Sequence, residues 1–219
     1  MNFSKTTALT TSKISPAVKI LIQKGLLRPE MKILDFGAGH GRHVLGLKNE
    51  GFQNVLGVDK FNQGKHVQDL EAAKGKSFDV AFSSFVLNVV PDSDHDFTDI
   101  DTEDDIIDFL KPVCSRQIHI VRNLDILEPL QRIQKVLKEK KVSNHTTNYI
   151  QKNFDKEISE RFMQGKASSD DLFFIASRGY ITKVTKEGIN FQRIPFLEEK
   201  GFDNYMTTPK FKIYIGDHF

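Results

Sequence analysis

The sequence has few of the features that mark secreted or membrane-spanning proteins. Its 219 residues include one cysteine, Cys114, which excludes a disulfide framework and a cysteine-rich zinc site within the chain. No run of residues is long and apolar enough to cross a bilayer. The polar, threonine-rich segment 1–12 also lacks the charged start and apolar core of a signal peptide. We therefore expect a cytoplasmic protein with no membrane partner.

The chain also lacks a strong net charge. Its formal net charge is +2, from 31 basic and 29 acidic residues, so net charge does not indicate a nucleic-acid partner, although it leaves room for a local basic patch. The hydrophobic share of 39% is sufficient for a core. There is no internal repeat and no low-complexity linker, and the length suits one elaborated α/β domain. We expect a single domain over residues 1–219.

Hydrophobic patterns and turn residues predict an alternation of helices and strands. Strands are expected over residues 32–36, 54–58, 78–82, 117–121, 179–185 and 211–215, with a short one near 66–67. Helices are expected over 14–27, 42–49 and 195–200, and another ends at 106–110. This order predicts an α/β fold, a Rossmann-like and mostly parallel sheet with helices on both faces. The last strand is expected at the edge of the sheet.

Three segments depart from a compact alternation. They are an N-terminal helical segment at 1–30, an acidic insert at 92–105 and a helical excursion at 127–166. The insert contains Asp92, Asp94, His95 and Asp96 without a glycine-turned calcium loop, so a solvated loop or lid is favoured and no metal site is predicted. The excursion is rich in lysine, which more often indicates a solvated helix surface than a face for an acidic partner.

A glycine-rich turn with two acidic residues is the most informative motif. Asp35 ends the first predicted strand, Gly37, Gly39 and Gly41 follow as G-x-G-x-G, and Asp59 ends the second strand. Glycines allow a ligand to approach the backbone closely, and the next helix begins with free N–H groups. A carboxylate at the second strand tip can accept two hydrogen bonds from a ribose.

Two cofactor classes fit such a turn. The nicotinamide fingerprint G-x-G-x-x-G requires a small residue at position 42, where this sequence has Arg42. Asp35 is placed to reach the cationic amino end of a methionine-like ligand. The pattern therefore favours S-adenosylmethionine. A nicotinamide-dependent enzyme and a plain turn that binds no cofactor are the alternatives.

The segment Asp35-Phe36-Gly37-Ala38-Gly39-His40-Gly41 resembles the first motif of class I S-adenosylmethionine-dependent methyltransferases. Residues 78–91 resemble the fourth motif, in which a strand ends beside the sulfonium. The resemblance implies the class I methyltransferase fold, here with a helical insertion, and assigns Asp59 to the ribose and Asp69-Leu70 to the adenine. The cofactor-binding residues that it implies are Asp35, Phe36, Gly37, Ala38, Gly39, Gly41, Asp59, Lys60, Asp69, Leu70, Ser83 and Ser84.

A finer resemblance concerns residues 7–13, 86–90 and 185–192, which are similar to a bacterial subgroup of DNA phosphorothioation-associated methyltransferases. The acidic insert and the helical excursion depart from the compact form of that subgroup.

The sequence lacks the motifs of two classes of DNA methyltransferase, and this bears on the methyl acceptor. The end of the fourth strand reads Ser83-Ser84-Phe85-Val86, without the Pro-Pro-aromatic motif of DNA base-amino methyltransferases. Cys114 follows Val113 instead of a proline, so it is expected to be a buried thiol and not the nucleophile of a cytosine methyltransferase. These absences disfavour the two DNA chemistries. Ser83-Ser84-Phe85 resembles the corresponding segment of many small-molecule methyltransferases, and this resemblance favours a small-molecule acceptor over RNA or protein. No catalytic residue is predicted. A non-catalytic methyltransferase-like binding protein is the alternative.

Overall fold

The structure is a computed structural model that describes residues 13–61, 64–88, 102–123, 151, 155–168, 171, 180–185, 188–193 and 197–217. Contacts divide the chain into two compact units. The first unit comprises 1–122 with 197–219, and the second comprises 123–196.

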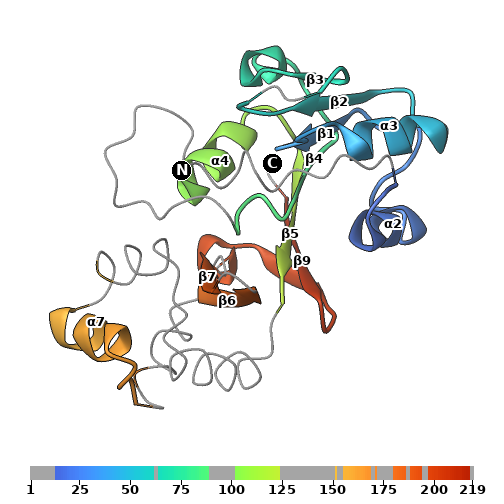
Figure 1. The fold of residues 1–219 in the computed structure, drawn as a ribbon. Helices are drawn as coiled ribbons and strands as arrows, with labels where there is room; N and C mark the ends of the chain where they lie inside the picture. The colour runs from blue at the N-terminus through green and yellow to red at the C-terminus, as the bar shows by residue number, and fades with distance from the viewer. Residues whose placement is uncertain are drawn as a thin grey trace. The chain divides into compact units, whose positions relative to one another are not determined.

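A seven-stranded sheet forms the centre of the first unit (Figure 1). Its strands, in spatial order, are β3 (Val67–Gln68), β2 (Val55–Val58), β1 (Ile33–Phe36), β4 (Val80–Ser84), β5 (Arg116–Arg122), β9 (Phe211–Asp217) and β8 (Asp203–Thr207). The pairings from β3 through β5 are parallel, and β9 pairs antiparallel with both β5 and β8. The predicted mostly parallel α/β sheet is confirmed. Its strand order reverses at β1, between β2 and β4.

The position of the last strand differs from the expectation. β9 lies inside the sheet, between β5 and β8, and the edge position falls to β8. β9 is internal because both of its edges are paired, one with β5 and the other with β8. Its Ile213 and Tyr214 point to opposite faces and are both buried. Four of the five β8 residues are exposed, so β8 has no buried face that the sequence could reveal.

Helices cover both faces of the sheet, as predicted. On one face, α2 (Pro16–Gln23) and α3 (Arg42–Asn49) share a buried cluster with Ile33 of β1. On the other face, α4 (Glu103–Leu110) shares a cluster with the next residue, Leu34. Successive residues of a strand point to opposite faces, so Asp35 lies on the α3 face with Ile33. Figure 1 shows α4 on one side of β1 and β4, and α2 with α3 on the other.

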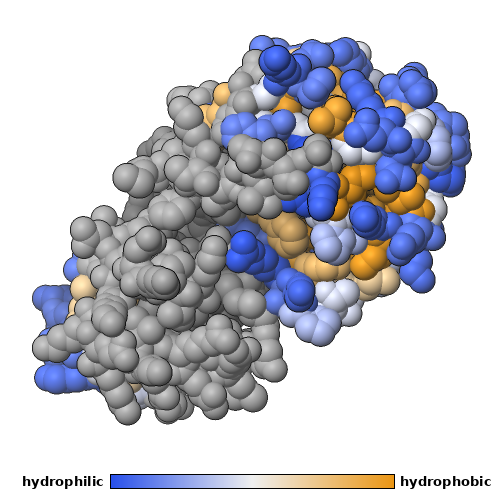
Figure 2. All heavy atoms as spheres, turned by 45° about the vertical axis from the view of Figure 1, so that its right-hand side comes forward, coloured by the Kyte–Doolittle hydropathy of each residue, from blue (hydrophilic) through white to orange (hydrophobic). Residues whose placement is uncertain are grey.

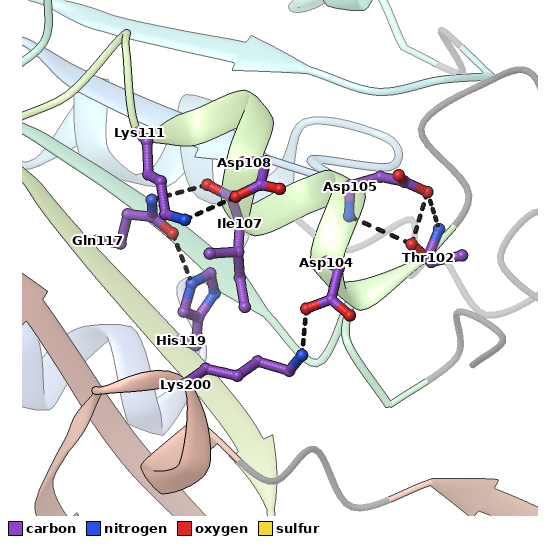
Figure 3. Close-up of polar contacts among 9 residues, drawn as sticks. All are labelled: Thr102, Asp104, Asp105, Ile107, Asp108, Lys111, Gln117, His119 and Lys200. Atoms are coloured by element: carbon purple, nitrogen blue, oxygen red, sulfur yellow. Dashed lines mark hydrogen bonds and ion pairs between the residues drawn. The ribbon is translucent and has the colours of Figure 1, made fainter. Parts of the chain in front are cut away.

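The helix α4 begins inside the acidic insert at 92–105. Thr102 is its N-cap, and Glu103, Asp104 and Asp105 form its first turn. Thr102 Oγ1 accepts from the Asp105 N–H at 3.2 Å, and Asp105 Oδ2 accepts from the Thr102 N–H at 2.9 Å (Figure 3). Acidic residues stabilise a helix at this end because their negative charges interact favourably with the positive end of the helix dipole. The structure therefore confirms the helix expected to end at 106–110 and places its first turn within the acidic insert. The residues expected to form a loop or lid, Asp92, Asp94, His95 and Asp96, lie outside the described residues.

Two 3-10 helices complete the first unit. η1 (Leu70–Ala73) follows β3, and η2 (Leu197–Lys200) precedes β8. Lys200 forms an ion pair with Asp104 of α4 (Figure 3). The expected short helix at 195–200 is thus present as η2.

The second unit contains α7 (Lys156–Met163) and a hairpin of β6 (Tyr180–Thr185) and β7 (Gly188–Arg193). Asp155 caps α7, and Arg161 donates two hydrogen bonds to the Asp171 carboxylate at 2.9 and 2.7 Å. The helix confirms the last part of the predicted helical excursion. Residues 124–150 lie outside the described residues. The strand β7 had no counterpart in the sequence expectations.

The face of the molecule shown in Figure 2 carries many hydrophilic side chains among the described residues, with hydrophobic areas between them. Among the described residues, the large hydrophobic side chains that are exposed are Met163 and Tyr205. No helix in the described part of the chain is long and apolar enough to span a membrane.

Candidate functional site

The glycine-rich turn lies at the carboxyl end of β1, where the strand order reverses. Its three glycines have left-handed backbones, with φ of 72° at Gly37, 56° at Gly39 and 77° at Gly41. A Cβ atom on Gly37 would lie 2.4 Å from Val86 Cγ2. Both the conformation and the close approach therefore require glycine at position 37. In open α/β sheets, ligands bind outside the carboxyl ends of the strands at such a point.

Asp59 connects the end of β2 to this turn. Its side chain is buried, Oδ2 accepts from the Gly39 N–H at 2.9 Å, and Oδ1 accepts from the Phe61 N–H at 2.8 Å. Each carboxylate oxygen can accept more than one hydrogen bond. Asp59 therefore orders the turn and still has acceptor capacity for a ligand hydroxyl.

Asp35 occupies the end of β1 beneath the turn. It is 1% exposed, and its Oδ2 has no hydrogen-bond partner among the described residues. Burial and the nearby Asp59 carboxylate raise the pKa of Asp35 to about 8, and Arg42 opposes this increase. A buried acceptor without a partner is unusual in a folded protein and often marks a place that a ligand or water completes.

Arg42 and His43 begin α3 beside Asp35. His43 Nδ1 is 3.9 Å from Asp35 Oδ2, and the His43 ring packs against Phe82 at a centroid distance of 5.9 Å. Burial, with a smaller contribution from Arg42, lowers the pKa of His43 to about 3, so the imidazole is neutral. Sequence reasoning used Arg42 only to choose between cofactors and did not place either residue in the site. The available signal was two basic residues directly after the third glycine.

A buried polar chain lies on the other face of the sheet, at the end of β4. Ser83 Oγ is 2.8 Å from His119 Nδ1, and His119 Nε2 is 3.0 Å from Gln117 Oε1. The Gln117 amide donates to the Ile107 carbonyl at 3.0 Å, so Oε1 is the acceptor for His119 (Figure 3). His119 therefore carries its proton on Nε2, and the Ser83 hydroxyl donates to Nδ1. The sequence analysis did not predict these hydrogen bonds between Ser83, His119 and Gln117.

The backbone changes direction immediately after β4. Phe85 has a φ of 64° and is the non-glycine residue with a positive φ among the described residues. Its N–H still donates to the Ile120 carbonyl at 2.8 Å. A bulky residue in this conformation costs free energy that the surrounding structure must offset, and such residues cluster at functional sites.

The other residues predicted for the site are distributed more widely. Phe36 is buried on the α4 face, where its ring lies 5.7 Å from that of Phe109. Lys60 is exposed at the end of β2. Asp69 is exposed and caps η1 by accepting from the Ala72 N–H at 3.2 Å. Leu70 packs against the cluster on the α4 face. The turn, Asp35 and Asp59 thus form the centre of the candidate site.

Cys114 is a core residue, as predicted. Its side chain is buried, and its thiol donates to the Leu110 carbonyl at 3.2 Å. Burial raises the pKa of this thiol to about 11, which keeps it protonated and a poor nucleophile. Within the described ranges there is no group of three or more His, Cys, Asp or Glu side chains placed to hold a metal ion. Asp92, Asp94, His95 and Asp96 lie outside those ranges.

The strand order, the helices on both faces and the glycine turn at the reversal point place the first unit in the Rossmann-like α/β class. Within this class, residues 11–112 match the model of a family described as a methyltransferase domain. The match covers just under half of the chain, and it includes the glycine turn, both acids and the end of β4. None of the curated proteins matches the chain in sequence. The finer resemblance to the phosphorothioation-associated subgroup stays a prediction.

Solved structures resemble the chain at low identity. The YcgJ protein from Bacillus subtilis is 11% identical, with a TM-score of 0.42 and coverage of 92% of this chain and 97% of its own. An S-adenosylmethionine-dependent methyltransferase from Thiobacillus denitrificans, solved with S-adenosyl-L-homocysteine, is 11% identical, with a TM-score of 0.41 and coverage of 98% and 96%. A Thermoplasma acidophilum protein is 12% identical, with a TM-score of 0.38 and coverage of 92% and 85%. Similarity at this level does not assign a ligand or a substrate to this chain.

Proposed function

We propose that the protein is a methyltransferase that uses S-adenosylmethionine and methylates a small molecule. The observation that carries this proposal is the unpartnered carboxyl oxygen of Asp35 beside a turn of three left-handed glycines. The match of residues 11–112 to a methyltransferase domain supports the choice of reaction.

The residues at the carboxyl ends of β1 and β2 offer hydrogen-bond acceptors that match the donor groups of S-adenosylmethionine. Asp35 offers an unused acceptor for an ammonium group, and Asp59 keeps acceptor capacity for ribose hydroxyls. The glycine turn lets the backbone approach a ligand without a side chain between them. When bound, S-adenosylmethionine supplies a methyl group that is already activated by the sulfonium charge. The protein then contributes mainly alignment of the acceptor with that methyl group.

The proposal of a small-molecule acceptor rests on the end of β4. Ser83 is fully buried, and its hydroxyl donates to His119 on the α4 face. A Pro-Pro-aromatic motif for a flipped DNA base is absent from the sequence at this position. Ser84 ends β4 and Phe85 follows it, and both residues are half-buried.

Calorimetric titration tests the donor site. S-adenosylmethionine and S-adenosylhomocysteine should both bind, and no heat at about millimolar ligand would refute the proposal, because enzymes typically have KM values at or below about 1 mM. A parallel titration of NADH, followed by its fluorescence, tests the nicotinamide alternative. Saturable NADH binding without binding of S-adenosylhomocysteine would favour a nicotinamide-dependent enzyme.

The role of Asp59 is tested by Asp59→Ala. We expect a loss of about 1–3 kcal/mol in binding of S-adenosylhomocysteine, because charge-assisted hydrogen bonds and the ordering of Gly39 are both removed. Asp108→Ala is the matched control, since Asp108 is an exposed acid on α4. An affinity equal to that of the control would refute the assignment.

The acceptor class is tested with S-adenosylmethionine labelled in its methyl group. The protein is incubated with cell extract separated into small-molecule, RNA and protein fractions, and transfer of label to each is measured. Label in the small-molecule fraction is expected. Label only in RNA or protein would refute this acceptor class, and donor binding with no label in any fraction would favour a non-catalytic binding protein.

A further inference from the structure

The two arginines at the ends of β5 differ in how their charges are compensated. Arg116, at the start of the strand, donates two hydrogen bonds to the Asp217 carboxylate, and these bonds raise the pKa of Arg116. Arg122, at the end of the strand, is half-buried, and none of the described carboxylates pairs with its guanidinium. Burial lowers the pKa of Arg122, although a guanidinium stays protonated near neutral pH. A permanent charge is thus partly removed from water without an opposite charge beside it.

This arrangement costs free energy that the fold does not require. A charge that loses water and gains no partner is destabilising. The end of β5 is held by its backbone, because the Arg122 N–H donates to Asn88 Oδ1 at 3.0 Å and the strand pairs with β9 as far as Phe211. The side chain of Arg122 is therefore not needed to fix the strand, and it is available to a ligand.

Arg122 lies on the same face of the sheet as the candidate donor site. Side chains alternate along a strand, so Arg122 shares a face with Ile120, which belongs to the cluster packed on α2 and α3. Asp35 also lies on this face. Phe82 pairs with both Asp35 and Ile118, so Arg122 is four residues, or about 13 Å, further along the strand direction than Asp35. Arg122 is therefore placed for a second ligand at this edge and not for the group nearest Asp35.

A second polar side chain lies beside it on β4. Ser84 shares the face of Phe82 and is half-buried, and it pairs with Ile120, two residues before Arg122. Within the described part of the chain its hydroxyl forms no hydrogen bond. The backbone of the next residue, Phe85, has the left-handed φ of 64° that often accompanies a functional site. A hydroxyl and a guanidinium are thus available at the carboxyl ends of β4 and β5, the edge at which open α/β sheets bind ligands.

We propose that the methyl acceptor is an anionic small molecule whose carboxylate or phosphate is bound by Arg122, with a further hydrogen bond from the Ser84 hydroxyl. The guanidinium presents its N–H groups in a fork that matches either anion. An anion held by a cation is a weak nucleophile, so the methylated atom is a different one and the product keeps its charge. This assignment rests on the proposed function and deepens it, because it names the chemical class of the acceptor.

The acceptor class is tested by separating a small-molecule extract on an anion exchanger before the reaction. Each fraction is incubated with the unmodified protein and S-adenosylmethionine labelled in its methyl group. We expect the acceptor in the retained, anionic fraction. Loss of acceptor activity after phosphatase treatment would identify the anion as a phosphate, and activity that survives would identify it as a carboxylate. An acceptor found only in the unretained fraction would overturn the inference and leave the proposed function intact.

Arg122→Met tests the residue itself, because methionine keeps an apolar stem and removes the charge. The variant should need at least about tenfold more of the retained fraction to reach half of its maximal rate, since charge-assisted hydrogen bonds to the acceptor are lost. Its affinity for S-adenosylhomocysteine should stay within about twofold of the unmodified value. Arg122→Lys keeps the charge without the fork and should fall between the two. Arg116→Met, at the other end of the same strand, is the matched control and should change neither quantity.

The outcomes separate this assignment from the proposed function. If the unmodified protein does not bind S-adenosylhomocysteine, the proposed function fails. If it binds this ligand but transfers no label in any fraction, the donor site stands, and both methyl transfer and the anionic acceptor are overturned. If Arg122→Met weakens the donor and the acceptor equally, or weakens neither, Arg122 does not bind the acceptor, while methyl transfer stands.

A binding measurement with inorganic phosphate as the probe needs no acceptor. Melting temperatures are compared in phosphate and in sodium chloride of the same ionic strength, with S-adenosylhomocysteine at saturation. Phosphate stabilises folded proteins in general, and this part of the effect is common to all variants. The unmodified protein and Arg116→Met should gain more than Arg122→Met, because an anion that binds the folded state stabilises it further. Equal gains for all three proteins would overturn the anion site.

Discussion

Asp35 is buried with a carboxyl oxygen that has no partner among the described residues, and this has a consequence for stability. Burial and Asp59 raise its pKa from 3.8 to about 8, so the folded protein holds this proton more tightly than the unfolded chain. The contribution of Asp35 to the free energy of unfolding is therefore fully present below the pKa of the unfolded chain. This contribution is lost as the pH rises through the pKa of the folded protein.

We therefore predict that Asp35→Asn stabilises the ligand-free protein more at pH 8 than at pH 5. The amide has nearly the shape of the neutral carboxyl but cannot ionise, so the loss of stability at high pH is removed. Thermal melting of both proteins across this range measures the effect. A difference in melting temperature that does not change with pH would contradict the raised pKa.

The hydrogen bonds that join the side chains of Ser83, His119 and Gln117 give a second prediction for single residues. Ser83→Ala removes the hydroxyl that donates to His119 Nδ1 and leaves that nitrogen buried without a donor. We expect the free energy of unfolding to fall by about 1–3 kcal/mol, measured by denaturant titration. Ser84→Ala, at the adjacent half-buried position, should cost less. Equal effects of the two substitutions would refute the importance of the chain.

These residues also show what the sequence can and cannot reveal about a site. The glycines, Asp35 and Asp59 were predictable because a strand, a turn and a helix follow one another locally. The pair Ser83 and His119 is separated by 36 residues and meets because the parallel register of β4 and β5 aligns them. Register depends on pairing between distant segments, so no local pattern indicates it.

At the scale of elements, α4 shows how a helix end can be expected while its start is not placed. A helix was expected to end at 106–110, and Glu103, Asp104 and Asp105 of the acidic insert occupy its first turn. The signal was present in Thr102, three residues before Asp105, followed by an apolar pair, Ile106 and Ile107. This is a capping-box pattern in which aspartate replaces the usual glutamate.

The cap gives a prediction for Thr102→Ala. Loss of the hydroxyl leaves the Asp105 N–H without its acceptor and should lower the free energy of unfolding by about 1 kcal/mol. Ser115→Ala is the control, because Ser115 is exposed in a bend between α4 and β5. Chemical denaturation of the two variants compares them. A value for Thr102→Ala no larger than that of the control would show that the cap does not stabilise α4.

Within the large sheet, the strands with buried residues were predictable and the exposed strand β8 was not. β1 and β2 were expected almost at their observed bounds because their residues are apolar and bounded by turn residues. β9 was also expected, but its place between β5 and β8 was not. The reason is physical, because β8 is an exposed strand whose five residues show no alternation of buried and exposed side chains. Without β8 in the prediction, β9 had no partner on its outer side.

At the scale of the whole molecule, the two units differ in what they contain. All seven strands of the large sheet, and the helices α2, α3 and α4, belong to the first unit. Both buried clusters consist of first-unit residues. The candidate site residues Asp35, Arg42, His43 and Asp59 also belong to this unit. A complete sheet with a core on each face should be able to fold without the second unit.

The corresponding experiment removes residues 123–196 and joins Arg122 to Leu197 with a flexible Gly/Ser linker of about 12 residues, which is long enough to span a typical distance between surface segments. We expect cooperative unfolding, because the β5–β9 pairing extends from Arg116 with Asp217 to Arg122 with Phe211 and remains intact. Binding of S-adenosylhomocysteine should stay within about threefold of that of the full chain, since a loss of less than 1 kcal/mol is expected when no contacting residue is removed.

Asp59→Ala in the shortened protein provides the control for that result. It should weaken S-adenosylhomocysteine by the same factor as in the full chain, because Asp59 acts on Gly39 and the ligand within the first unit. Sites that do not share partners with the excised residues combine additively, so a different factor would show coupling to the second unit. Loss of the cooperative transition would show instead that the second unit is needed for the sheet to fold, and the site would then depend on residues far from β1 and β2.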